Sequence, residues 1–130
     1  MISFQPKLVA AGYHSQRLRE LTGLETEELQ AKRLLASFDR YNARENKVGL
    51  PIGEMAKKWI TEVFEPVISR VPDDMRGRVE RAQMFHEILE NRWYLSEKAG
   101  YDVGLEEATD NYCAEILPMR RDSGVDIVVE

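Results

Sequence analysis

One series of apolar residues, between positions 55 and 71, constrains the fold more than any other feature of this 130-residue chain. The series advances in steps of mostly three and four residues, which places its members on one broad face of an α-helix. Its members are Met55, Trp59, Ile60, Val63, Phe64, Val67, Ile68 and Val71. Pro66 lies inside the series and lacks the backbone N–H that a helix interior requires. The pattern therefore predicts an amphipathic helix with a kink or break at Pro66.

The same periodicity predicts most of the remaining secondary structure. Further helices are expected over about 14–22, 25–44, 79–99 and 105–118, with a single turn over 72–77. Gly23 and Gly100 follow two of these helices, and glycine readily adopts the left-handed conformation that ends a helix. The sequence therefore predicts about five helices.

Two of the predicted helices have distinct apolar patterns. The helix over 25–44 carries one stripe, formed by Ala31, Leu34, Leu35, Phe38 and Tyr41. Glu25, Glu27 and Glu28 are expected in its first turn, where the helix dipole favours acidic side chains. The helix over 79–99 carries Ala82, Phe85, Ile88, Leu89 and Trp93, plus a second strip of Met84, Tyr94 and Leu95. Because it is apolar on more than one side, we predict that it is the central helix of a bundle.

Both ends of the chain have an extended pattern. Apolar residues alternate over 2–9, and 125–129 is rich in β-branched residues. At 130 residues, the chain has the usual size of one domain and can form a single core without disulfides or metal ions. We therefore predict an all-α fold, a compact bundle of about five helices with short extended N- and C-terminal segments. One helical domain would span 1–130, with 119–130 as an extended tail.

Cysteine content and hydropathy bear on the compartment. Cys113 is the only cysteine, so no intrachain disulfide can form, and its helical setting favours a small buried side chain. No signal-peptide core follows Met1, and no apolar stretch approaches the roughly 20 residues that span a bilayer. These features predict a cytoplasmic protein without a membrane partner.

Charge is unevenly distributed along the chain. Residues 1–60 carry ten Lys or Arg and seven Asp or Glu, whereas residues 61–130 carry eight and sixteen. Such asymmetry can mark an interaction surface, or the two halves can complement each other within the fold. Nucleic-acid binders concentrate Lys and Arg, so the sequence pI of about 5.2 argues against that class. Nucleic-acid binding by the basic N-terminal half is a weaker third hypothesis.

The most suggestive polar cluster covers residues 86–93. His86 and Glu90 are four residues apart and share a helical face, a spacing that suits two metal ligands. The cluster lacks the second histidine of zinc proteases and the Glu-x-x-His of di-iron helices, so further acids such as Asp110 or Glu115 would be needed. The structural alternative is a network of ion pairs and hydrogen bonds that involves Glu87, Glu90 and Arg92.

A second cluster opens the first predicted helix. His14, Ser15, Arg17 and Arg19 lie where backbone N–H groups could hold an anion. The alternative is an ordinary helix start in which Ser15 is the N-cap. The candidate ligand-binding residues of the chain are thus His86, Glu87, Glu90, Arg92, His14 and Arg17.

Motifs of known catalytic chemistry are missing from the sequence. There is no Gly-x-Ser-x-Gly elbow, no glycine-rich phosphate loop with a lysine, and no kinase catalytic-loop motif. The segment 49–59 fits a helix-turn-helix poorly, because its second helix has few polar residues that could contact bases. We assign no catalytic residue, no metal ligand and no cofactor from the sequence.

Three blocks of sequence resemble an actinobacterial domain of unknown function found at the C-terminal end of larger chains. They are residues 12–24, 62–67 and 85–97, and the last continues over 98–108 and closes at Ile116-Leu117-Pro118. The resemblance covers about 5–118. In that family the domain follows a region similar to lipopolysaccharide kinases, which implies an accessory module without nucleotide-binding machinery. The family pattern often has histidine at the position of Asn91, and this departure weakens a metal or acid–base role for the cluster.

Two hypotheses of function follow. The first is a non-catalytic regulatory or interaction module that binds the kinase-like region of its parent chain, or another protein. The second is a metal- or small-ligand-binding helical enzyme centred on His86 and Glu90. The sequence does not predict the oligomeric state.

Overall fold

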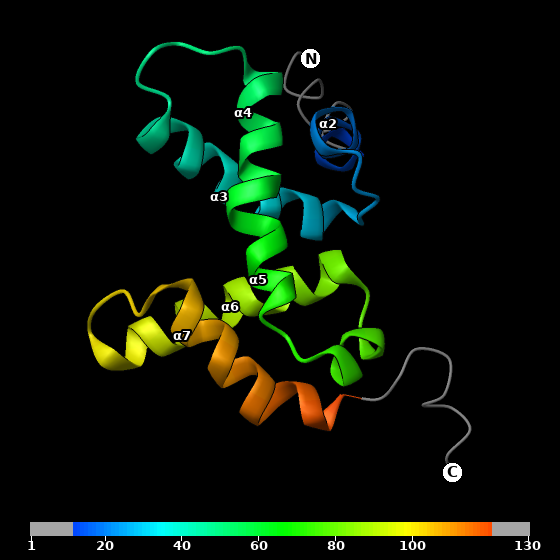
Figure 1. The fold of residues 1–130 in the computed structure, drawn as a ribbon, viewed down its shortest axis with the longest axis vertical. Coiled ribbons are helices and arrows are strands. Elements are labelled where there is room, and N and C mark those ends of the chain that lie inside the picture. The colour runs from blue at the N-terminus through cyan, green and yellow to red at the C-terminus, as the bar shows by residue number, and fades with distance from the viewer. Residues whose placement is uncertain (1–11, 121–130) are drawn as a thin grey trace, which may run out of the picture. The chain divides into compact units, whose positions relative to one another are not determined.

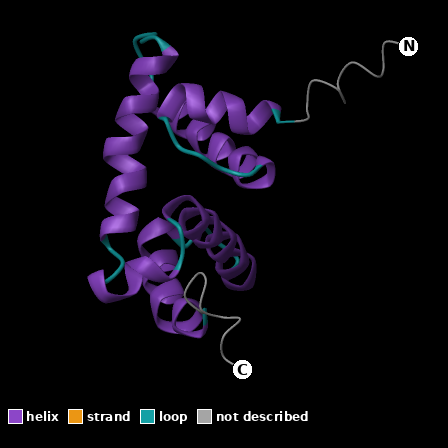
Figure 2. Cartoon of the chain, turned by 90° about the vertical axis from the view of Figure 1, so that its right-hand side faces the viewer, coloured by secondary structure: helices purple, strands orange, loops and turns teal. Residues whose placement is uncertain are grey.

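The fold is all-α, as predicted. The computed structural model describes residues 12–120, and helices account for 80% of it, with six α-helices, five of them of seven residues or more. Helices and loops alone make up the described part of the chain, which contains no strand (Figure 1, Figure 2). The extended segments predicted over 2–9 and 125–129 lie outside the described residues. Of the predicted tail, Met119 is helical and Arg120 is extended.

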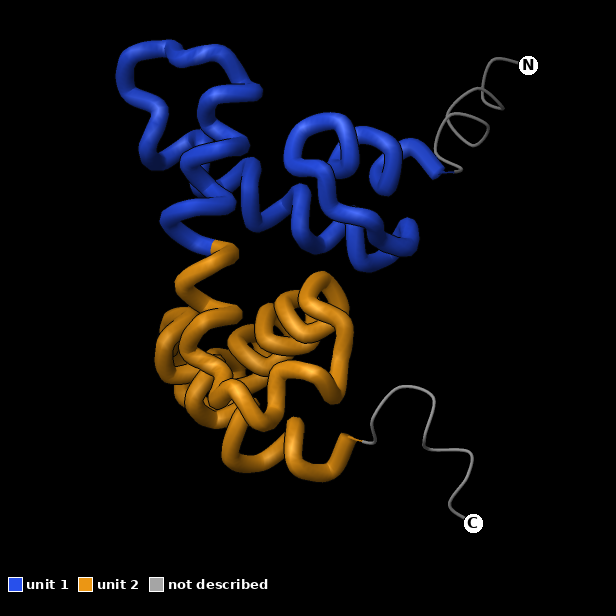
Figure 3. The backbone as a smooth tube through the Cα atoms, turned by 45° about the vertical axis from the view of Figure 1, so that its right-hand side comes forward, with its two compact units in different colours: residues 1–63 blue, residues 64–130 orange. Residues whose placement is uncertain are grey.

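The chain divides into two compact units, residues 1–63 and residues 64–130 (Figure 3). The single domain over 1–130 stays a prediction. Each unit has its own apolar core, and each is described separately below.

Three helices form the first unit: α2 (Tyr13–Thr22), α3 (Glu28–Glu45) and α4 (Ile52–Trp59). All three pack against one another. The entire predicted stripe of α3 is buried, and the core of the unit consists of Leu18, Ala31, Leu34, Leu35, Phe38, Tyr41, Met55, Ala56 and Trp59. The rings of Phe38 and Trp59 meet edge to face with centroids 6.1 Å apart. Gly23 ends α2 with φ 82°, which confirms the predicted C-cap.

The start of α3 differs from the prediction. The helix begins at Glu28, and Glu27 is its N-cap. The Glu27 side chain accepts a hydrogen bond from the backbone of Gln30, and the Gln30 side chain accepts one from the backbone of Glu27. This reciprocal capping box satisfies two donors at the helix end, so Glu25 lies before the helix and only Glu28 occupies the first turn.

The helix predicted over 55–71 is continuous from Ile52 to Ser69, so no break occurs at Pro66, but its α-helical pattern is interrupted before the proline. A π-helical segment, η1 (Ile60–Phe64), lies between α4 and α5 (Glu65–Ser69), which contains Pro66 in its first turn. In a continuous α-helix the ring of Pro66 would clash with the carbonyl group of Glu62, four residues earlier. Glu62 lies in the middle of the π-helical segment, where the wider turn relieves this conflict.

The second unit is built around α6 (Arg81–Ala99), which packs against α5 and α7 (Gly104–Asn111). A 3-10 turn, η2 (Asp73–Arg78), precedes α6 at the predicted position. After α7 the chain continues as a π-helical segment, η3 (Tyr112–Ile116), and a 3-10 turn, η4 (Leu117–Met119). The apolar core consists of Phe64, Val67, Ile68, Val71, Val79, Ala82, Met84, Phe85, Ile88, Leu89, Ala108, Tyr112 and Leu117.

Only the first half of α6 is central to its unit. Ile88 and Leu89 are buried, but Trp93 is 64% exposed and Tyr94 is 55% exposed. The prediction of a helix buried on several sides is therefore wrong for the last two turns. Gly100, with φ 84°, ends the helix as predicted.

Candidate functional site

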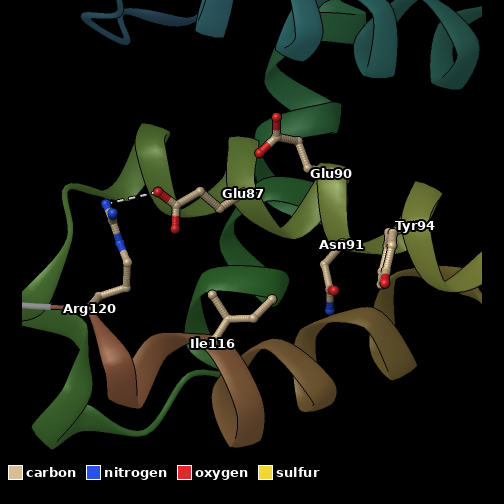
Figure 4. Close-up of a pocket in the computed structure, with 6 residues that line it drawn as sticks. All are labelled: Glu87, Glu90, Asn91, Tyr94, Ile116 and Arg120. Carbon is tan, nitrogen blue, oxygen red and sulfur yellow. Dashed lines mark ion pairs between the residues drawn. The ribbon is translucent and has the colours of Figure 1, made fainter.

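Four side chains of α6 form a polar stripe on one side of an open pocket. Glu87, Glu90, Asn91 and Tyr94 are spaced by three, four and seven residues from the first, so they share one helical face. Across the pocket lie Ile116 of η3 and Arg120, which follows η4 (Figure 4). The pocket has a volume of about 360 Å³.

Glu87 is the most deeply embedded of the lining carboxylates, with a side chain only 13% exposed. It accepts hydrogen bonds from Gln83 Nε2 at 2.6 Å and from the Tyr112 hydroxyl at 2.6 Å, and it pairs with Arg120 Nη2 at 2.9 Å (Figure 4). Burial, together with the bond to this carboxylate, raises the pKa of the Tyr112 phenol well above its usual range. Glu87 thus joins α6 to the C-terminal segments of the unit.

His86 and Glu90 do share a helical face, as predicted. Glu90 Oε2 lies 3.8 Å from His86 Nε2, and His86 is buried. Within residues 12–120, the buried Nδ1 atom of His86 has no hydrogen-bond partner, and no three His, Cys, Asp or Glu side chains are grouped so that they could hold a metal ion. Asp110, one of the acids considered above, is bonded instead to Arg70 at 2.7 Å.

Arg92 belongs to a different contact. It forms a bidentate pair with Asp102 at 2.9 and 2.5 Å, which ties α6 to the loop before α7. The Asp102 carboxylate also accepts a hydrogen bond from the backbone N–H of Gly104 at 2.9 Å. The network of ion pairs and hydrogen bonds expected around Glu87 and Arg92 is therefore two separate sets of contacts. Glu87 bonds to Gln83, Tyr112 and Arg120, whereas Arg92 pairs with Asp102.

Asn91 is a buried bridge that sequence reasoning missed. It is 5% exposed, and its Nδ2 donates to the backbone oxygen of Ala108 and to Asn111 Oδ1, both at 3.0 Å. A signal existed, because Asn91 falls in the helical series Met84, Ile88, Leu95 at a position where an apolar residue is expected. Arg120 was missed without a comparable signal, since its role depends on where the chain end packs.

In the first unit, the proposed anion position at the start of α2 is filled by Glu28 of α3. The carboxylate of Glu28 accepts hydrogen bonds from the backbone N–H groups of His14 and Ser15 at 3.1 and 3.0 Å, and contacts His14 Nδ1 at 2.5 Å. Desolvation raises the pKa of Glu28, but these hydrogen bonds outweigh it and hold the pKa below its usual value. Arg17 lies one turn along and does not line the described pocket.

Ser15 is not the N-cap of α2. That position belongs to Gly12, whose φ of 75° is left-handed, and the Ser15 hydroxyl donates to its carbonyl oxygen at 3.1 Å. The carboxylate of Glu28 satisfies the first backbone donors instead. The Glu28 carboxylate of α3 thus takes the capping role that the sequence predicted for the Ser15 side chain.

Cys113 is partly exposed, although the sequence suggested a buried side chain. Partial burial and then the nearby Asp110 carboxylate raise the pKa of its thiol. Because the thiolate is the nucleophilic form, this setting opposes nucleophilic catalysis at Cys113.

The chain belongs to the family described as domain of unknown function DUF4032, which matches it over residues 1–117. This range includes every candidate residue named from the sequence and all of the pocket except Arg120. No curated protein and no solved structure matches the chain.

No helix between residues 12 and 120 combines the length and the apolar character that a membrane crossing requires.

Proposed function

We propose that this chain is a non-catalytic interaction module that docks onto a kinase-like region of a larger, cytoplasmic, actinobacterial protein. The resemblance of its sequence blocks to a domain that follows such a region supports the identity of the partner. Membership of a family described as a domain of unknown function fits an uncharacterised module.

The observation that carries the proposal is a group of exposed aromatic side chains at the end of α6. This aromatic end, defined as Trp93, Tyr94 and Tyr101, has side chains 64%, 55% and 65% exposed. Tryptophan and tyrosine are enriched at protein interfaces, where they contribute large contact areas at a low cost in conformational entropy. These three exposed side chains, within nine positions of the sequence, support the proposal of a partner contact near the end of α6.

Charge specifies the partner further. Residues 61–130 carry an excess of eight acidic over basic side chains. Near the aromatic end lie Glu90 and Glu97, and Lys98 Nζ lies 5.1 Å from the ring centroid of Tyr94. A partner surface rich in Lys and Arg would complement this unit and accelerate association.

The test uses the complete parent chain with Trp93 and Tyr101 both replaced by alanine. Docking stabilises the partner region by mass action, so we expect its unfolding temperature to fall by several degrees. Leu29→Ala is the matched control, because Leu29 is 61% exposed in the other unit and should leave that temperature unchanged. An unchanged unfolding temperature in the double variant contradicts the proposal.

A further inference from the structure

The pocket beside α6 has the size of a small-molecule site. Its volume of about 360 Å³ lies near the lower end of the range for ligand pockets, roughly 300–1,000 Å³. It therefore suits one bicyclic ring or the terminal group of a larger molecule. Its lining comes from two parts of the second unit, with α6 on one side and Ile116 and Arg120 on the other (Figure 4).

The charged side chains of the lining already have partners. Glu87 Oε2 pairs with Arg120 Nη2 at 2.9 Å, and Glu87 Oε1 accepts a hydrogen bond from the Tyr112 hydroxyl at 2.6 Å. Glu90 is not free either, and its Oε2 lies 3.8 Å from His86 Nε2. A charged ligand would have to compete with these contacts. Recognition of a ligand therefore falls to the uncharged side chains of the lining.

Asn91 is the uncharged lining residue with the most defined geometry. It is 5% exposed, and its Nδ2 donates to the Ala108 backbone oxygen and to Asn111 Oδ1, both at 3.0 Å. These bonds use both amide hydrogens and leave Oδ1 as the acceptor. None of residues 12–120 donates to Oδ1, although this atom is not sealed from solvent. The pocket is thus the place where a donor can reach a buried, oriented amide oxygen.

Tyr94 and Ile116 add apolar surface to the pocket. Tyr94 follows Asn91 by three residues on the same face of α6, and Figure 4 shows its ring edge-on with one face turned toward Asn91. Lys98 Nζ lies 5.1 Å from the centroid of this ring, a cation–π contact that restricts its motion. Ile116 belongs to η3, across the pocket. A flat molecule that reaches Asn91 therefore meets an aromatic face and an aliphatic side chain.

These side chains define a ligand that donates one hydrogen bond and needs none in return. Asn91 offers an acceptor, while both of its donor hydrogens are occupied. Hydroxyl and amide groups carry acceptor lone pairs as well as donors, and an ammonium group carries a charge. An indole ring has a single N–H donor and no acceptor, and its flat apolar surface suits stacking on tyrosine.

From these contacts we infer that the pocket binds an indole ring. The indole N–H donates to Asn91 Oδ1, the ring stacks on Tyr94, and its hydrocarbon edge contacts Ile116. Tryptophan side chains of proteins and free indole compounds share this chemistry, so both are candidate sources of the ring. The inference goes beyond the docking function proposed above, and it is tested without the parent chain, so either can fail alone.

The test is an NMR titration of the complete 130-residue chain with indole near neutral pH. We expect saturable shifts of the side-chain amide signals of Asn91 and of the ring signals of Tyr94. Benzofuran has nearly the same shape as indole, with an oxygen atom in place of the N–H group. It should bind about tenfold more weakly, because the hydrogen bond to Asn91 is lost.

N-acetyltryptophanamide separates the two sources of the ring. It carries the tryptophan side chain with an uncharged amide group on each side. Tighter binding than that of indole identifies a tryptophan side chain of a protein as the source, because the amide groups then add contacts. Equal or weaker binding identifies a free indole compound.

Variants of Tyr94 test the stacking contact. Tyr94→Ala removes the aromatic face and should weaken indole binding about tenfold, whereas Tyr94→Phe keeps the ring and should retain full affinity. Tyr13→Ala is the matched control, because Tyr13 is 45% exposed in the first unit and does not line the pocket. Circular dichroism of each variant confirms that the helices are retained. No saturable shift with indole, equal affinity for benzofuran, or full affinity in Tyr94→Ala would each overturn the inference.

Discussion

The described part of each unit contains a tyrosine–glutamate pair, and the carboxylates of the two pairs differ in exposure. In the first unit the Tyr41 hydroxyl donates to Glu62 Oε1 at 2.5 Å, and in the second the Tyr112 hydroxyl donates to Glu87 Oε1 at 2.6 Å. In both pairs the second carboxylate oxygen contacts a cationic side chain: Lys58 at 3.3 Å and Arg120 at 2.9 Å, respectively.

The two pairs differ in how far solvent reaches their carboxylates. The Glu62 side chain is 52% exposed, whereas that of Glu87 is 13% exposed. Water can replace a lost partner of Glu62 but has little access to the partners of Glu87. The same arrangement of groups should therefore contribute much more to stability in the second unit.

The largest expected effect comes from removal of the carboxylates. Glu87→Ala leaves the buried Tyr112 hydroxyl without its partner and removes the ion pair with Arg120, and we expect it to lower the free energy of unfolding by about 2–4 kcal/mol. Glu62→Ala should lower it by less than about 1 kcal/mol. Urea denaturation of both variants measures the difference. Equal losses would show that exposure does not decide the contribution of these pairs.

Removal of the two tyrosine hydroxyl groups should give a smaller difference in stability between the pairs. Tyr112→Phe leaves Glu87 with its bonds to Gln83 and Arg120, so we expect a loss of about 1–2 kcal/mol. Tyr41→Phe should cost about 0.5 kcal/mol, since solvent reaches the Glu62 carboxylate. Thermal or urea unfolding measures both. A larger loss in Tyr41→Phe would reverse the comparison.

The smallest expected effect is a pH dependence of the Tyr41–Glu62 pair. Burial and the bond to Glu62 raise the pKa of Tyr41 from 10.0 to about 12. A raised pKa in the folded state means that the stabilising contribution is complete below pH 10 and is lost as the pH rises to about 12. The difference in unfolding free energy between the unaltered chain and Tyr41→Phe should shrink over this range. A difference in unfolding free energy that stays constant between pH 10 and pH 12 would contradict this prediction.

Both pairs include a residue from a π-helical segment, and both segments precede a proline. Glu62 lies in η1 and Tyr112 in η3, and each segment ends two residues before Pro66 or Pro118. The carbonyl group four residues before each proline lies inside the segment, where a proline ring would disturb an α-helix. A proline inside an apolar helical series predicts a kink or break, which is why Pro66 was expected to disturb its helix. Pro118 lies at the end of the last predicted helix and predicts only that the helix stops.

Local features were the most predictable. The buried stripe of α3 and the glycine caps of α2 and α6 follow from periodicity and from backbone conformations that glycine adopts easily. The exposure of Trp93 and Tyr94 was not predictable in this way, because α6 carries apolar residues on several sides and only tertiary packing selects which are covered.

The candidate pocket was predictable only in part. His86, Glu87 and Glu90 were identified by their helical spacing, and two of them do line the pocket. Their partners Tyr112 and Arg120 lie more than 20 residues away in the sequence, so the contacts depend on how η3 and η4 pack against α6. No spacing rule within one helix contains that information.

The π-helical segment η3 has a consequence for orientation. An α-helix advances about 100° per residue, so the wider turn of η3 changes the direction in which every later side chain points. With the side chains turned in this way, Leu117 is fully buried and Arg120 reaches Glu87. The position of Pro118 thus sets the rotation of the chain end about the helix axis. Moving the proline by one position would direct a different residue to the Glu87 carboxylate.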